Sequence, residues 1–182
     1  MAWIDKQAIF SPFASYGGSP DSLAISTATA SSGTYDITGA GVGTAPPQIF
    51  GTASSFGADM GVGDGAWMPF VLVLITTTLV GGTAMNFALQ SAPDNGANGL
   101  GTAITVDETG AIPVASLTAG TRFTLAFNRR QQGASPPRFC RMLYTPTGTF
   151  TAGAVSAGIV VGNVNDIDIG QIAGNIGFGT AG

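Results

Sequence analysis

Residues 67–78 read WMPFVLVLITTT, and after Gly81-Gly82 residues 83–91 read TAMNFALQS. The first run is apolar and rich in β-branched residues, which predicts a long strand buried on both faces over part of its length. The second run predicts a half-buried strand, because alternate residues share a face: Met85, Phe87 and Leu89 on one side, and Asn86, Ala88 and Gln90 on the other. The glycine pair is a tight-turn signal, so we expect the two runs to form a β-hairpin.

The rest of the chain continues this pattern of short strands separated by turn residues. No amphipathic helix of about 10 or more residues is found. The sequence therefore predicts an all-β protein. Besides the two runs above, the expected strands are residues 4–10, 23–29, 102–107, 112–115, 122–128, 138–145 and 154–164.

Composition points to a single soluble domain, with room for an appended arm. The chain has 182 residues, of which 45% are hydrophobic and only 9% charged. Its longest strongly apolar stretch, Phe70 to Val80, has 11 residues, whereas a membrane-spanning helix needs about 20. The first residues, Met1 to Lys6, show no basic segment followed by an apolar core, so we expect neither a signal peptide nor a membrane partner.

Several catalytic and metal-binding chemistries are missing from the composition. There is no histidine and only one cysteine, which excludes Ser-His-Asp and Cys-His catalysis and every multi-cysteine zinc pattern. Cys140 is expected to be a small buried hydrophobe, and Asp94-Asn95-Gly96 is expected to form a turn. Asp166 and Asp168 would face the same way on a strand, but a hydrolase pair needs a cleft between elements. We expect a binding or structural protein, not an enzyme, with no cofactor and no metal.

The basic residues are concentrated late in the chain. Residues 1–121 carry Lys6 against eight acidic residues, a net of −7, while residues 122–182 carry five arginines against two, a net of +3. The segment 122–141 holds all five arginines and could contact carboxylates of a partner protein; the alternative is ordinary solubility or pairing with acidic residues of the same chain. A nucleic-acid partner is not expected at a net charge of −4. The candidate contacts are Arg122, Arg129, Arg130, Arg138 and Arg141.

Two glycine-rich regions differ from the expected core. Residues 30–66 are small and glycine-rich, as an insertion would be, and residues 163–182 combine glycine with isolated apolar side chains. We expect the second region to be an arm that a neighbouring chain holds, because ordering so much glycine costs backbone entropy. The alternative is that it packs on its own domain. The candidate contacts in the arm are Ile167, Ile169, Ile172, Ile176 and Phe178.

Three stretches occur in an order that resembles a known family. They are Gly110 to Leu117 with Ala119-Gly120, then Arg138 to Tyr144, then Gly148 to Val155. The start of the chain, Ile4 to Gln7 with Phe10-Ser11, is similar to the start of the same family. This arrangement resembles the small jelly-roll capsid cement (decoration) proteins of short-tailed bacteriophages. The resemblance covers residues 1–11 and about 67–162; residues 30–66 and 163–182 depart from it.

The resemblance implies a jelly-roll core, an antiparallel sandwich of about eight strands, over residues 1–162 including the insertion, followed by the arm at 163–182. It further implies a protein that self-associates, as a dimer or a trimer, and sits on the outer surface of the shell formed by the major capsid protein. Such a protein would be assembled into virions in the host cytoplasm and would stabilise the shell by bridging its subunits.

Three other functions stay open on the sequence. A virion spike or fibre tip would bind a host-surface glycan and needs aromatic platforms, for which few tryptophans and tyrosines are available. A surface-layer or pilus-like subunit would need a secretion signal. A carboxylate-dependent glycosidase would have to rely on Asp166 and Asp168.

Overall fold

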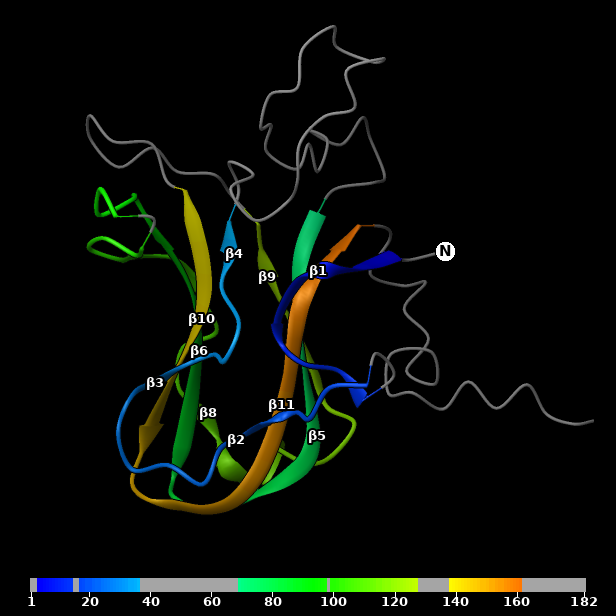
Figure 1. The fold of residues 1–182 in the computed structure, drawn as a ribbon. Coiled ribbons are helices and arrows are strands. Elements are labelled where there is room, and N and C mark those ends of the chain that lie inside the picture. The colour runs from blue at the N-terminus through cyan, green and yellow to red at the C-terminus, as the bar shows by residue number, and fades with distance from the viewer. Residues whose placement is uncertain (1–2, 15–16, 37–68, 98, 128–137, 162–182) are drawn as a thin grey trace, which may run out of the picture.

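The computed structural model describes residues 3–14, 17–36, 69–97, 99–127 and 138–161. Within these ranges the chain is all-β, as predicted, and its only described helix is a single 3-10 turn at Val114–Ser116. The strands form two antiparallel sheets that face each other as a sandwich (Figure 1).

The first sheet is built around two long strands. β11 (Phe150–Val161) and β5 (Pro69–Gly81) lie side by side at its centre. β1 (Trp3–Ser11) pairs with the free edge of β11, and β9 (Arg122–Ala126) pairs with the free edge of β5. The short β2 (Asp21–Ser22) also pairs with β11.

The second sheet is centred on β10 (Phe139–Thr147) and β6 (Ala84–Ala92), which pair along nine residues each. β3 (Thr29–Ala30) and β4 (Tyr35–Asp36) follow one another along the outer edge of β10. β7 (Ile104–Glu108) and β8 (Ile112–Pro113) follow one another along the outer edge of β6.

This strand order is that of a jelly roll. If β1 with β2, β3 with β4 and β7 with β8 each count as one position, the described residues have eight strand positions. The first sheet then contains the first, eighth, third and sixth of them, and the second sheet contains the second, seventh, fourth and fifth. Successive strands thus fold over as two Greek keys, which defines the architecture.

The core lies between the sheets and is filled by the inward faces of both. Phe87, on β6, stacks on Phe123 of β9 with 5.6 Å between ring centroids and meets Tyr144 of β10 edge-on at 5.8 Å. The predicted alternation in β6 is confirmed, since Met85, Phe87 and Leu89 are all buried. The contact between Phe87 and Phe123 joins the two sheets by apolar burial, whereas Phe87 and Tyr144 lie opposite each other within the second sheet.

The first sheet is also covered on its outer face, which explains why residues 70–75 of β5 are all buried. Phe70, Leu72 and Leu74 point away from the other sheet and form a second cluster with Val160 and Phe13. Phe13 follows β1, and the Ser156 hydroxyl fixes that segment by donating a 2.6 Å hydrogen bond to the Pro12 carbonyl. The long apolar run therefore has two buried faces, as the sequence predicts.

The predicted hairpin between residues 67–78 and 83–91 is wrong. β5 and β6 belong to different sheets, and each already has neighbours on both sides. Gly81 and Gly82 do adopt positive φ angles, 83° and 61°, but the turn carries the chain across the end of the sandwich. Gly82 lies against the Phe150 ring, where a Cβ would be 2.4 Å from the nearest ring carbon. The glycines are needed for this close approach as well as for the turn.

Residues 23–29 are not the strand that the sequence predicts. After β2 the chain leaves the first sheet, crosses the end of the sandwich and joins the second sheet at β3. The crossing is held by hydrogen bonds from the Leu23 amide to the Gly153 carbonyl and from the Phe150 amide to the Ile25 carbonyl. Beyond it, Ser31 and Tyr35 are buried although they fall in the predicted insertion. Residues 37–66 lie outside the described residues.

Candidate interaction surfaces

The structure separates the candidate arginines that it describes. Arg122 is exposed on β9, at the edge of the first sheet. Arg138 directly precedes β10, and Arg141 lies on it, both in the second sheet. The three side chains therefore do not gather on one face of the sandwich, since the chain crosses from one sheet to the other between β9 and β10.

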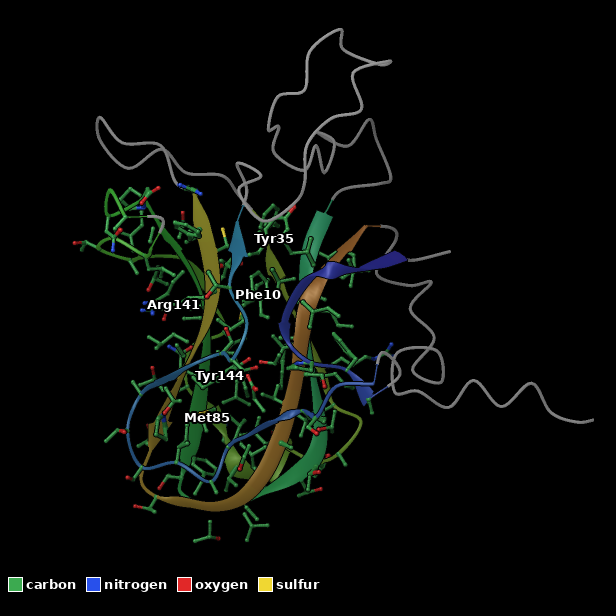
Figure 2. The ribbon with its side chains drawn as sticks, in the orientation of Figure 1. Phe10, Tyr35, Met85, Arg141 and Tyr144 are labelled. Carbon is green, nitrogen blue, oxygen red and sulfur yellow. The ribbon has the colours of Figure 1, made fainter. Side chains whose placement is uncertain are left out.

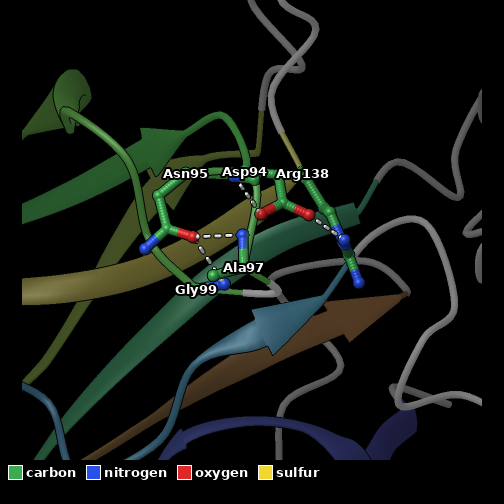
Figure 3. Close-up of polar contacts among 6 residues, drawn as sticks. Asp94, Asn95, Ala97, Gly99 and Arg138 are labelled. Atoms are coloured by element: carbon green, nitrogen blue, oxygen red, sulfur yellow. Dashed lines mark hydrogen bonds and ion pairs between the residues drawn. The ribbon is translucent and has the colours of Figure 1, made fainter.

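Arg138 is engaged within its own chain. Its guanidinium pairs with the Asp94 carboxylate and lies 4.8 Å from the centroid of the Phe139 ring. Asp94 opens the loop shown in Figure 3, where its other carboxylate oxygen accepts a hydrogen bond from the Gly96 amide. The side chain of Asn95 accepts hydrogen bonds from two further amides of the same loop. The turn predicted at Asp94-Asn95-Gly96 is confirmed, and Arg138 anchors it to the start of β10.

Arg141 lies on the outer side of the second sheet (Figure 2). Its Nε donates a 3.0 Å hydrogen bond to the side-chain oxygen of Gln90, the residue directly opposite on β6. Asn86, on the same strand, donates likewise to Glu108 at 2.7 Å. These polar side chains are thus paired across strands; Arg141, Gln90 and Asn86 are partly exposed, and Glu108 is exposed.

The other candidate contacts lie outside the described residues. These are Arg129 and Arg130, and in the C-terminal arm Ile167, Ile169, Ile172, Ile176 and Phe178, together with Asp166 and Asp168. They stay predictions of the sequence.

Cys140 is buried on β10 and packs in the core between the sheets, as expected. Across residues 3–14, 17–36, 69–97, 99–127 and 138–161, no group of three or more carboxylate, cysteine or histidine side chains is placed to hold a metal ion. Within the same ranges, no helix is both long and apolar enough to span a bilayer.

A buried polar network joins the two sheets, and sequence reasoning missed it. Ser11, at the end of β1, donates a 2.6 Å hydrogen bond to the Asp21 carboxylate and lies 2.5 Å from the Tyr144 hydroxyl of β10. Asp21 also accepts a 2.8 Å bond from the Ser32 amide. Ser11 has a single proton, which it gives to the carboxylate, so the Tyr144 hydroxyl must be the donor in the contact between them.

The environment of Tyr144 keeps its hydroxyl protonated. Burial raises the pKa of Tyr144 well above its ordinary range, and the nearby Asp21 charge adds to this rise. Figure 2 shows Tyr144 in the space between the sheets. Because neither Ser11 nor Tyr144 is exposed to solvent, the hydrogen bond between their hydroxyls can hold the two sheets in position.

Comparison with known families gives a match that covers most of the sandwich. A family model described as Bbp16 matches residues 24–159, from the segment that crosses between the sheets to Ile159, near the end of β11. No curated protein matches the chain. Since the matched region is well over half of the sequence, the chain belongs to the Bbp16 family.

Proposed function

We propose that this protein is a capsid cement protein, which binds the outer surface of a bacteriophage shell and bridges neighbouring major capsid subunits. The observation that carries the proposal is the jelly-roll strand order, which is the fold that the resemblance to cement proteins implies. The stretches that carry the resemblance are structural parts of this fold. Residues 110–117 form β8 and the 3-10 turn, residues 138–144 enter and form β10, and residues 148–155 make the turn into β11.

Such a protein would act by adhesion. A standard protein interface buries about 1,600 Å², and the affinity that results depends on how much ordering the contact requires. The described sandwich has a closed core, and a surface that is already ordered loses little entropy on binding. Self-association as a dimer or a trimer would add avidity, because each later contact with the shell becomes intramolecular. Bridged subunits would then resist the outward pressure of a packaged genome.

The test is binding to purified shells that lack the protein. We expect saturable co-sedimentation, with a fixed ratio of this chain to the major capsid protein at saturation. Shells that already carry their full complement of unlabelled protein are the control and should take up no labelled protein. If the protein pellets no more with bare shells than alone, the proposed function is wrong.

A further inference from the structure

One end of the sandwich is made of four connections that lie together below the labels of β8 and β2 in Figure 1. We call it the threonine-rich end. It comprises residues 24–28 (AISTA), 78–84 (TLVGGTA), 113–119 (PVASLTA) and 146–152 (PTGTFTA). None of these four segments contains a charged residue. Its exposed side chains are mainly hydroxyls and methyl groups, whereas soluble surfaces are usually about 25–35% charged.

The four connections are hydrogen-bonded to one another. The Thr83 amide donates to the Thr147 carbonyl at 2.7 Å, and the Val114 amide donates to the Thr83 carbonyl at 2.9 Å. The Ala119 amide donates to the Thr78 hydroxyl at 3.0 Å. The crossing segment is joined to the others through the bond between the Phe150 amide and the Ile25 carbonyl. The surface is therefore already in a fixed conformation before any partner arrives.

An exposed apolar residue lies within this surface. Val80 is 53% exposed, and it is the one large hydrophobic side chain so exposed among the side chains whose burial the structure describes. The Val80 carbonyl accepts a 3.3 Å hydrogen bond from the Thr151 hydroxyl, which fixes the backbone at this position. The opposite end differs, because the Asp94 loop and Arg138 place an ion pair there.

We infer that the threonine-rich end is the surface that docks on the shell, and that its partner is an uncharged, flat surface of the shell-forming subunit. The inference rests on the proposed function and specifies which face meets the shell. Interface cores are depleted of charged residues, and a fixed surface loses little entropy on binding. A charged group of the partner placed against this end would lose its hydration and meet no counter-charge. Charge complementarity therefore requires an uncharged partner surface.

The experiment introduces single charges of both signs at this end and measures binding to bare shells. The variants are Val80→Lys, Thr149→Lys and Thr149→Glu, at exposed positions of the threonine-rich end. The matched controls are Thr124→Lys and Thr124→Glu, at an exposed position of β9 on the side of the sandwich. Far-UV circular dichroism and the mass of each free variant show whether fold and self-association are kept.

We expect each of the three variants to raise the Kd for shells by about tenfold or more, because a charge is buried without a partner. Lysine and glutamate at position 149 should weaken binding alike, and the Thr124 variants should bind like the wild type. The inference is overturned if the three variants bind normally, if one sign of charge strengthens binding, or if they weaken binding only by dissociating the oligomer. If binding is lost because the oligomer dissociates, the threonine-rich end contacts a second copy of this chain and not the shell. A wild-type protein that does not bind shells would instead refute the proposed function itself.

Discussion

The buried network of Ser11, Asp21 and Tyr144 should show strong energetic coupling between residues far apart in the chain. Ser11 and Tyr144 are 133 positions apart and lie in different sheets. We consider three variants: Ser11→Ala, Tyr144→Phe and the double substitution. Each removes a hydroxyl from a fully buried position and leaves almost no cavity, so the hydrogen bonds dominate the change in stability.

The structure predicts unequal costs for the two single variants. Tyr144→Phe removes one donor, while Ser11 keeps its bond to Asp21, so the free energy of unfolding should fall by about 1 kcal/mol. Ser11→Ala removes a bond to a carboxylate and leaves the buried Tyr144 hydroxyl without its acceptor, at a cost of about 3 kcal/mol. In the double variant no buried hydroxyl is left without a hydrogen-bond partner, so the free energy of unfolding should fall by about 2 kcal/mol.

The assay is urea unfolding of the four proteins, followed by far-UV circular dichroism. Ser26→Ala, at an exposed position of the crossing segment, is the matched control and should change stability by less than about 0.5 kcal/mol. The double variant should be less destabilised than the sum of the single variants by about 2 kcal/mol. Strictly additive costs, or a Ser11→Ala variant no less stable than Ser26→Ala, would refute the network as a tie between the sheets.

Three further predictions follow from particular residues and segments. Gly82→Ala should cost roughly 3 kcal/mol in unfolding free energy, since its Cβ would overlap the Phe150 ring. Gly110→Ala, with a φ of 70° and open space around it, should lower the free energy of unfolding by only about 1 kcal/mol. Equal losses of stability in the two variants would contradict the overlap with the Phe150 ring as the cause. Above pH 10, the usual pKa of tyrosine, the unfolded chain ionises Tyr144 and the folded chain does not. Unfolding experiments should therefore show the wild type losing about 1.4 kcal/mol per pH unit more than Tyr144→Phe, and parallel pH profiles would argue against it. Deletion of residues 163–182 should leave the circular dichroism of the sandwich intact and weaken self-association or shell binding; unchanged binding in sedimentation would disprove the arm hypothesis.

The sequence was sufficient for the long strands, though not for residues 23–29, because burial of a long strand leaves a hydrophobic period that can be read directly. Residues 84–92 alternate because one face of β6 packs in the core. β5 has a continuous apolar run because both of its faces are buried. The pairing of the strands was harder to predict, because Gly81-Gly82 is compatible both with a hairpin and with a turn that links two sheets. The choice between them depends on β11 and β9 already flanking β5, which local sequence cannot show.

The candidate site was less predictable, because its parts come from distant segments. The arginines are close in sequence, yet Arg122 and Arg141 lie on opposite sheets. The threonine-rich end is assembled from four separate connections, each of which reads as an ordinary turn by itself. Its lack of charge becomes visible only when the fold brings the four together.

The most direct test of the central claim is the temperature at which shells rupture, measured on bare shells and on shells fully loaded with this protein. If the protein bridges neighbouring subunits, loaded shells should rupture at a clearly higher temperature. Addition of the Thr149→Lys variant at the same concentration should raise that temperature less. Full occupancy by the wild type with no change in the rupture temperature would contradict the account.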